Sequence, residues 1–321
     1  MNVKSGLQKI TMGVPQGSIL GPLLFLLYIN DFPKISTKFE SFLYADDTAL
    51  FFKADSTNEL QKMLDEELPK VHKWLQTNKL TLNIDKTVYQ IYNKSKTEEH
   101  VQVNLAGSLI QQTNVVKYLG IMVEENMKWE AHVMHISRII SRNIGIINRS
   151  KHFLNKEYLQ LLYNAMVLPY INYCCLLWGT SSKSALHRLT ILQKKIIRII
   201  DGQPKLTHTS PIFAKLNILK LEDIALYQML LVMHNVITEN APSAITSLFK
   251  LEECTGRPSR IPRHFYEPFT TKMYCTSAIT WIGPRLWNTI IAPRFPQLNS
   301  VPSSKRQIKE LIKIHMTNDY Q

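Results

Sequence analysis

Cysteine is scarce in this sequence, and its spacing provides neither a metal-binding nor a disulfide framework. Four cysteines occur among 321 residues, and they form no CxxC pair and no cluster with histidine: Cys174, Cys175, Cys254 and Cys275. This pattern disfavours zinc fingers and disulfide-rich scaffolds. Because disulfide scaffolds belong to oxidising environments, we expect an intracellular protein in a reducing compartment.

Long apolar runs are lacking as well. The most apolar segment covers residues 19–32 and is interrupted by Pro22, Asn30 and Asp31, whereas a helix that crosses a bilayer needs about 20 consecutive apolar residues. The first residues show no cationic and apolar segment of the kind that directs secretion. We therefore expect a soluble chain with no membrane partner.

Acidic residues are outnumbered by basic ones. Asp and Glu total 25 against 38 Lys and Arg, which gives a formal net charge of +13. A basic protein attracts polyanions, so nucleic acid is the first candidate partner. Hydrophobic residues make up 45% of the chain, enough to fill the cores of about two domains.

Two features near the start of the chain stand out. Residues 13–32 begin with turn-forming residues and become almost wholly apolar, which predicts a loop that leads into a buried helix. Residues 42–52 place β-prone runs on both sides of Asp46 and Asp47, which predicts a hairpin with carboxylates at its tip.

The pattern then changes between helix and strand. Ser56 and Glu59 have capping-box spacing ahead of a periodic helix that contains Pro69. Short strands are predicted at 80–84, 88–92, 101–105 and 115–123. Residues 1–125 therefore read as a first domain of mixed α+β structure.

The rest of the chain is mainly helical and then irregular. Residues 126–245 form a predicted helical domain, with periodic segments at 130–149, 156–178, 181–200 and 222–238. Residues 246–321 contain seven prolines between Pro258 and Pro302, which predict an irregular basic region that ends in a helix at 303–315. The predicted fold class is α+β.

The pair Asp46-Asp47 is the strongest chemical signal in the sequence. Nucleotidyl transfer with two magnesium ions needs carboxylates that hold hard cations against phosphates, and a hairpin tip presents such groups well. An isolated Asp-Asp pair elsewhere would be read as a simple turn. Here the flanking runs Phe42-Leu43-Tyr44 and Ala49-Leu50-Phe51 make glycine the better choice for a turn alone.

Four motifs in order carry a family resemblance. GVPQGSILGPLLF, YADD, WLQTNKLTLNIDKT and VKYLGIMV are similar to the successive palm motifs of reverse transcriptases from non-LTR (LINE-type) retrotransposons. Further along, Leu168-Pro169-Tyr170 with Trp178-Gly179, and the segment GPRLWN at 283–288, resemble the region that follows the palm in those proteins. The resemblance covers nearly the whole chain.

The resemblance implies roles for particular residues. Asp46 corresponds to the metal-binding palm aspartate and Asp47 is its neighbour, so a two-metal Mg²⁺ site is implied. Lys86 resembles the lysine near the triphosphate, where a cation could stabilise or protonate departing pyrophosphate, although a solvated surface lysine is the alternative. The substrate-binding loop beside the incoming nucleotide is implied to contain Pro15, Gln16, Gly17 and Ser18.

The fold and the partners follow from the same resemblance. Tyr118, Leu119 and Gly120 resemble the primer-grip hairpin, while spacing alone indicates only a strand that ends at a turn. The implied architecture is a partial palm over 1–125, a thumb-like region over 126–245 and a basic C-terminal region over 246–321. The implied partners are an RNA template, a DNA primer and deoxynucleotides, in the nucleus or a cytoplasmic ribonucleoprotein.

The family places another catalytic aspartate upstream of the PQGS motif. Residues 1–12 contain neither Asp nor Glu, so we expect that the 321-residue chain alone does not extend a primer. Two further hypotheses stay open beside the polymerase: a catalytically dead nucleic-acid-binding remnant and a relative of intron maturases. Reading the genomic sequence upstream of Met1 distinguishes the polymerase from the dead remnant.

Basic and aromatic residues in the later parts allow two interpretations. The basic residues could follow a phosphate backbone or simply keep the surface hydrated; they are Arg138, Arg142, Arg149, Lys151, Arg188, Lys194, Lys195 and Arg198. Aromatic residues interleaved with arginine over 257–287 could stack on single strands or form a small core. We favour a core position for Trp281 and Trp287.

Overall fold

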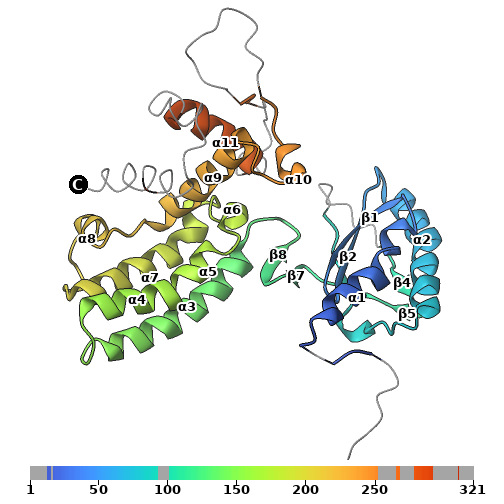
Figure 1. Cartoon of the computed structure of the whole chain (residues 1–321), viewed down its shortest axis with the longest axis horizontal. Helices are drawn as coiled ribbons and strands as arrows, with labels where there is room; N and C mark the ends of the chain where they lie inside the picture. The colour runs from blue at the N-terminus through green and yellow to red at the C-terminus, as the bar shows by residue number, and fades with distance from the viewer. Residues whose placement is uncertain are drawn as a thin grey trace, which may run out of the picture. The chain divides into compact units, whose positions relative to one another are not determined.

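The computed structural model describes residues 13–15, 17–92, 101–251, 265–267, 278–291 and 310. The chain divides into two compact units, residues 1–113 and 114–321 (Figure 1). Helices and strands are mixed, in agreement with the predicted α+β class. The three-part domain division stays a prediction. None of the helices in the described ranges combines the length and apolar character needed to cross a membrane.

The first unit is built around a two-stranded antiparallel hairpin and a long helix beside it. Helix α2 begins after Ser56, whose hydroxyl accepts a hydrogen bond from the Glu59 amide at 3.2 Å, so the predicted capping signal is confirmed. Pro69 lies inside this helix without ending it. The larger elements are α1 (Leu20–Ile29), η1 (Phe32–Lys34), β1 (Phe39–Tyr44), β2 (Asp47–Phe52) and α2 (Thr57–Thr77).

One face of the β1–β2 hairpin packs into the core of the first unit. Its apolar side chains meet residues of α1 and α2, in a cluster that includes Ile29, Phe32, Phe39, Leu43, Leu50, Phe52 and Val71. The opposite face leaves aromatic side chains exposed, namely Phe42, Tyr44 and Phe51. Alternation along a strand explains both observations. Helix α1 also exposes most of its apolar side chains, including Leu20, Leu23, Leu26 and Leu27.

The predicted strand at 80–84 is wrong. Residues 80–83 form no helix or strand, and the chain then enters a short 3₁₀ helix, η2 (Ile84–Lys86), where the Asn83 side chain accepts a hydrogen bond from the Lys86 amide at 3.2 Å and favours a local turn. The strands predicted at 88–92 and 101–105 shrink to two residues each. The short strands are β3 (Val88–Tyr89), β4 (Asn104–Leu105), β5 (Ser108–Leu109) and β6 (Gln111–Gln112).

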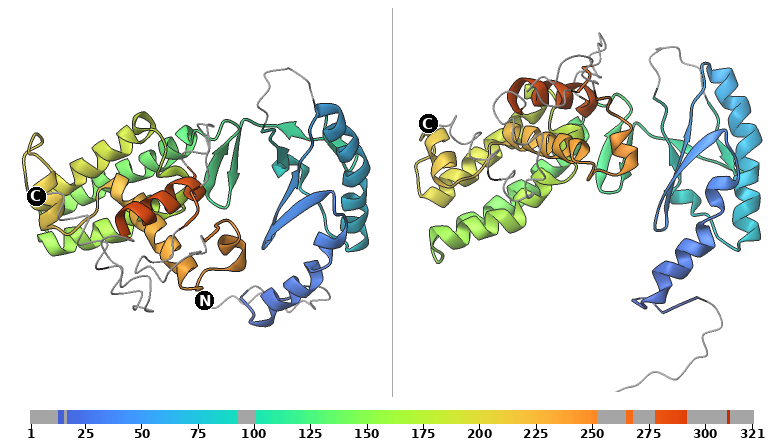
Figure 2. Two further views of the ribbon diagram at one scale, coloured as in Figure 1. Left: turned by 90° about the horizontal axis from the view of Figure 1, so that it is seen from above. Right: turned by 45° about the horizontal axis from the view of Figure 1, so that its top comes forward.

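The second unit starts with a hairpin and continues as a helical bundle. The strand predicted at 115–123 is two antiparallel strands, with Tyr118 paired to Ile121. In Figure 2, α3, α4 and α7 lie side by side, and they contact one another. The elements up to α7 are β7 (Val115–Tyr118), β8 (Ile121–Glu124), α3 (Glu130–Ser150), α4 (Lys156–Met166), α5 (Leu168–Asn172), α6 (Cys175–Trp178) and α7 (Lys183–Asp201).

The helix predicted at 156–178 is interrupted twice. Pro169 restricts the residue before it and lacks an amide hydrogen, so the chain breaks between α4 and α5. Cys174 has a left-handed φ of 50°, which separates α5 from α6. The helices predicted at 130–149, 181–200 and 222–238 are confirmed within one or two residues.

Helix α9 (Leu221–Ile237) is the central helix of the second unit and is buried on several sides. It packs against α5, α6, α7 and α11 (Ile279–Leu286). Close packing is permitted by glycine, because a Cβ on Gly179 would lie 2.7 Å from the Cβ of Ala225 on α9. The remaining elements are α8 (Ser210–Lys215), α10 (Ser243–Thr246) and the π-helical turn η3 (Trp287–Ile291).

The end of the chain is more regular than predicted where it is described. Pro284 lies inside α11, within a region that the prolines predicted to be irregular. Packing of α11 against α9 supports the helix despite the backbone hydrogen bond that a proline removes. Trp287 and Phe265 are buried against each other. The core position predicted for Trp287 is confirmed, whereas Trp281 is half-buried and lies under the Arg285 guanidinium. The helix predicted at 303–315 falls almost wholly outside the described residues.

Candidate functional site

The β1–β2 hairpin presents Asp46 and Asp47 at its tip. Tyr44 pairs with Asp47, which leaves Ala45 and Asp46 as a two-residue turn. Ala45 has a φ of 52°, a left-handed conformation that glycine adopts more easily. The tight turn therefore holds a strained alanine next to an aspartate, and the predicted hairpin with carboxylates at its tip is confirmed.

Both carboxylates are exposed, and neither forms an ion pair with another described residue. Carboxylate oxygens are the ligands that hard cations such as Mg²⁺ prefer. Asp46 and Asp47 therefore fit one side of such a site by donor type and exposure. Within the described ranges, no group of three His, Cys, Asp or Glu side chains lies close enough to hold a metal ion.

The loop before α1 is shaped by a glycine and a serine. The Ser18 amide donates a hydrogen bond to the Pro15 carbonyl at 3.1 Å, and Gly17 has a φ of 82° inside this turn. The Ser18 hydroxyl then accepts from the Gly21 amide at 3.2 Å, near the start of α1. Pro15, Gly17 and Ser18 thus form a compact turn at a helix entrance, and Gln16 lies outside the described residues.

Lys86 ends the 3₁₀ turn η2, and its side chain is exposed. Asn83 organises this turn, because its carbonyl also accepts a hydrogen bond from the Thr87 hydroxyl at 2.8 Å. Lys86 takes part in none of the ion pairs between described residues. Its ammonium group is therefore exposed and paired with no carboxylate of the described residues.

The β7–β8 turn lies in the second unit. Leu119 and Gly120 are its two central residues, with φ of 45° and 83°, as in a type I′ hairpin turn. Tyr118 is the last residue of β7 and is half-buried. The sequence reasoning indicated a strand that ends at a turn here, which the structure confirms.

Glu124 and His132, to which the sequence motifs assign no role, hold this hairpin. Glu124 on β8 accepts a hydrogen bond from the Ala131 amide at the start of α3. His132 accepts one from the Met122 amide at 3.4 Å. Burial lowers the pKa of His132 to about 4, and nearby His135 acts in the same direction, so His132 is neutral and serves as an acceptor.

The outward faces of α3 and α7 form a basic surface. The exposed basic side chains on the two helices include Arg138, Arg142, Arg149, Arg188, Lys194 and Lys195. After Glu130, α3 has no acidic residue, and in α7 the only acidic residue is Asp201 at its end. We name these six residues the α3–α7 basic face, whose uncompensated charge suits a phosphate backbone.

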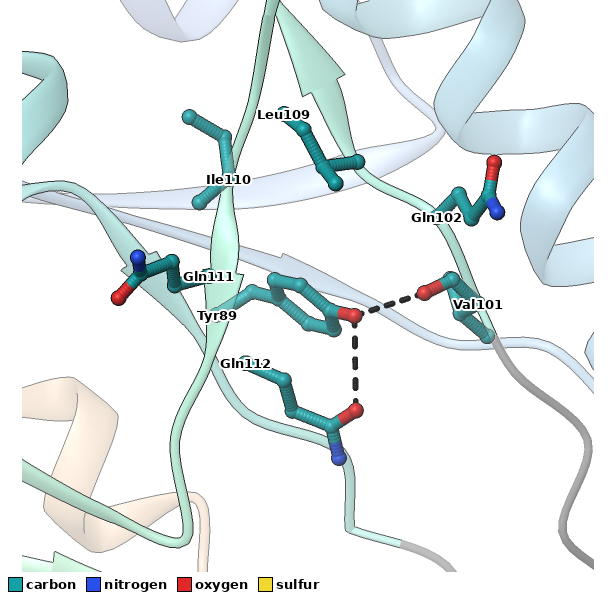
Figure 3. A pocket seen from close by; sticks show the side chains of 7 residues that line it. All are labelled: Tyr89, Val101, Gln102, Leu109, Ile110, Gln111 and Gln112. Atoms are coloured by element: carbon teal, nitrogen blue, oxygen red, sulfur yellow. Dashed lines mark hydrogen bonds between the residues drawn. The ribbon is translucent and has the colours of Figure 1, made fainter.

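A shallow pocket in the first unit is separate from these residues. Figure 3 shows Tyr89, whose hydroxyl donates to the Val101 carbonyl at 2.7 Å, beside Gln112. The pocket has a volume of about 420 Å³ and also contacts Gln102, Leu109, Ile110 and Gln111. It includes no charged side chain and none of the predicted site residues.

Comparisons with known proteins connect these features. Residues 1–123 match the sequence profile of the family described as "Reverse transcriptase (RNA-dependent DNA polymerase)". The chain is 29% identical over 232 residues to the RNA-directed DNA polymerase from mobile element jockey of Drosophila melanogaster, an alignment that covers 68% of this chain and 25% of that protein.

The chain is related to the reverse transcriptases of non-LTR retrotransposons. This reverse transcriptase relative is also 27% identical over 223 residues to the probable RNA-directed DNA polymerase from transposon BS of Drosophila melanogaster, covering 66% of this chain and 24% of the other. It is 29% identical over 154 residues to the retrovirus-related Pol polyprotein from a type-1 retrotransposable element R1 of Nasonia vitripennis, covering 46% and 44%.

The reverse transcriptase match contains the candidate residues of the first unit and the β7–β8 turn, but not the α3–α7 basic face. The profile over residues 1–123 includes the loop at 13–18, Asp46, Lys86 and the β7–β8 turn. The chain spans about a quarter of the length of the jockey and BS polymerases that it matches. No solved structure matches the chain.

Proposed function

We propose that this chain is the part of a non-LTR retrotransposon RNA-directed DNA polymerase that carries the palm hairpin, the nucleotide loop and the primer grip. The observation that supports this most strongly is the position of Asp46 and Asp47 at the tip of a strained hairpin, inside the segment that matches the reverse transcriptase profile. In this proposal, residues 13–123 supply part of the palm and the following helices a thumb-like region.

Asp46 is the proposed metal-binding carboxylate, with Asp47 beside it. Both side chains are exposed at the tip, so their oxygens can approach a cation that is also bound by substrate phosphates. Bound Mg²⁺ would supply charge neutralisation at the reacting phosphate. In the proposal, the hairpin keeps the two carboxylates fixed, because Asp47 is held by its pairing with Tyr44.

The loop before α1 is the proposed contact with the incoming deoxynucleotide. Gly17 has an open left-handed conformation with no neighbouring atom within 4 Å of where a Cβ would be, so the backbone there is accessible for close approach by a ligand. Lys86 is exposed and forms no ion pair with a described residue, and we assign it to the triphosphate, where it would stabilise the charge on pyrophosphate as it leaves.

The proposed nucleic-acid partners are an RNA template and a DNA primer. The α3–α7 basic face would contact their phosphates, and Tyr118, Leu119 and Gly120 would hold the primer end. Three arginines on one face of α3 make binding sensitive to salt and tolerant of sequence, because phosphate contacts carry little sequence information.

Primer extension tests the proposal with two proteins. One is the 321-residue chain, and the other is a chimera in which the upstream part of the jockey polymerase precedes it. Each is given Mg²⁺, deoxynucleotides and a primed RNA template. We expect extension by the chimera and none by the chain alone, because two-metal chemistry needs ligands on both sides of the cations and the loss of groups that act together is not additive.

Asp46→Asn and Asp85→Asn serve as a matched pair in the chimera. Both remove one exposed carboxylate, but we expect only Asp46→Asn to abolish extension. Extension by the chain alone that Asp46→Asn removes would show that the expected inactivity is wrong. A folded chimera that binds the primed template and stays inert would overturn the polymerase proposal in favour of a dead nucleic-acid-binding remnant.

A further inference from the structure

The β7–β8 turn has a conformation that its own sequence does not favour. Both central residues of a type I′ turn need a positive φ, and asparagine followed by glycine is the common solution. Here Leu119, with a φ of 45°, occupies the first central position. A leucine in the left-handed region is strained, so contacts from outside the hairpin must help to hold the turn.

Tyr173 provides those contacts. Its hydroxyl donates a hydrogen bond to the Leu119 carbonyl at 2.6 Å. Its ring lies beside Gly120, since a Cβ built on that glycine would be 3.5 Å from the ring carbon Cε1. Tyr173 therefore contacts both central residues of the turn, although 54 positions separate it from Leu119 in the sequence.

The main chain of Tyr173 is itself fixed by the helical bundle. Its amide donates to the Pro169 carbonyl at 2.9 Å, and its carbonyl accepts from the indole nitrogen of Trp178 at 3.0 Å. Trp178 is fully buried. The phenol thus projects from a connection between α5 and α6 whose main chain is hydrogen-bonded on both sides.

A second path joins Trp178 back to the same hairpin. The ring of His132 packs edge-on against Trp178, with 5.5 Å between ring centroids. His132 in turn accepts the hydrogen bond from the Met122 amide on β8. Leu119 and Met122 are therefore both held by the bundle, and the contacts form a closed circuit through Tyr173, Trp178 and His132.

We propose that Tyr173 is a positioning residue for the primer terminus, because it fixes the β7–β8 turn to the helical bundle. Half of its side chain remains exposed, so water could satisfy its hydroxyl, and burial does not force the bond to Leu119. The inference rests on the proposed function in one respect, namely that the turn is a primer grip. The contact itself is independent of that function.

The first experiment measures how firmly the turn is held in the free 321-residue chain. Tyr173→Phe removes only the hydroxyl, and Tyr170→Phe is the matched control, since the Tyr170 hydroxyl makes no hydrogen bond to any described residue. We expect hydrogen exchange in residues 115–124 to become severalfold faster in Tyr173→Phe, at an unchanged melting temperature. Equal exchange in the two variants would overturn the positioning role.

The second experiment asks whether the fixed turn serves the primer end. A fluorescent base at the 3′ end of a DNA primer, annealed to RNA, reports on its environment when the chain binds. We expect Tyr173→Phe to reduce this signal severalfold while affinity for unprimed RNA stays unchanged. Faster exchange with an undiminished signal would keep the positioning of the turn but overturn its use as a primer grip.

Discussion

The side chain of Asn288 pairs with both main-chain polar groups of Phe265. The Phe265 amide donates to Oδ1 at 3.0 Å, and Nδ2 donates to the Phe265 carbonyl at 2.8 Å. This side chain imitates a paired strand and joins the segment around Phe265 to the turn that carries the buried Trp287. It gives the GPRLWN motif a structural role in the second unit.

Replacing Asn288 should loosen this attachment. Asn288→Leu has a similar size but leaves a main-chain donor and acceptor of Phe265 without partners, so we expect the free energy of unfolding of the second unit to fall by about 2 kcal/mol. Urea unfolding followed by tryptophan fluorescence measures it. Asn240→Leu, at an exposed position, should change the midpoint little. Equal midpoints for both variants would contradict the pairing role.

The salt dependence of nucleic-acid binding reports on the α3–α7 basic face. Each phosphate contact adds roughly 0.9 to the slope of log K against log salt for a duplex and 0.7 for a single strand. Changing Arg138, Arg142 and Arg149 to glutamine should therefore lower the slope by about 2 to 3 if all three contact phosphates. Fluorescence anisotropy with primed RNA at several salt concentrations gives the slope.

A charge-matched control separates this face from net charge. Lys53, Lys62 and Lys73 are exposed residues of the first unit, and α2 also carries acidic side chains such as Glu66. Glutamine at these three positions removes the same charge but should leave the slope nearly unchanged. If the slope of log K against log salt fell equally in both triple variants, binding would depend on overall charge and not on the α3–α7 basic face.

His132 makes the second unit sensitive to mild acid. Its folded pKa is about 4 against an ordinary 6.5, chiefly because of burial, so the unfolded chain takes up a proton first as the pH falls. The free energy of unfolding is therefore unaffected by this histidine above pH 6.5. It declines as the pH falls toward 4, by up to roughly 3 kcal/mol. Chemical unfolding at several pH values should show a smaller decline in His132→Gln. Parallel curves would exclude this histidine as the cause.

Asp201 makes the free energy of unfolding depend on pH in a second, more acidic range. Burial acts to raise the pKa of Asp201, but hydrogen bonds from Lys156, Lys215 and Gln203 outweigh it and bring the value to about 2. Because this folded pKa is below the ordinary 3.8, the stabilisation is present above about pH 4 and is lost as the pH falls through 2.

The variant Asp201→Asn tests whether Asp201 stabilises the fold in this pH range. At neutral pH we expect a loss of roughly 2 kcal/mol, since each unit of pKa corresponds to about 1.4 kcal/mol. The variant should also show a weaker pH dependence than the parent between pH 4 and 2 in unfolding experiments. Asp85→Asn, which replaces an exposed carboxylate, is the control. If the free energy of unfolding of Asp201→Asn changed with pH as steeply as that of the parent, the titrating group would be a residue other than Asp201.

Local patterns account for what could be predicted from the sequence. The hairpin around Asp46 follows from β-prone residues on both sides, and the start of α2 follows from Ser56 and Glu59. The long helices α3, α7 and α9 follow from apolar periodicity. In each case the signal lies within a few residues of the element itself.

The remaining features depend on contacts between distant residues. No residue near Leu119 predicts that Tyr173 donates a hydrogen bond to its carbonyl. Likewise, the Trp178-Gly179 motif does not by itself predict that Gly179 lies close to Ala225 of α9. The break at Pro169 and the local turn around Asn83 depend on single residues, whereas the helix predicted at 156–178 rests on apolar periodicity and the strand predicted at 80–84 on a β-prone run. The roles of Asp46, Lys86 and the nucleotide loop stay predictions.

The burial of α9 from both sides has a consequence for synthesis of the chain. Helices α5, α6 and α7 come earlier in the sequence, so one side of α9 can pack as soon as it leaves the ribosome. The other side waits for α11, which is made later. At synthesis rates of roughly 5–20 residues per second, apolar residues such as Met233 stay uncovered for several seconds. During that interval we expect the uncovered side of α9 to be the part of the nascent second unit most prone to aggregation.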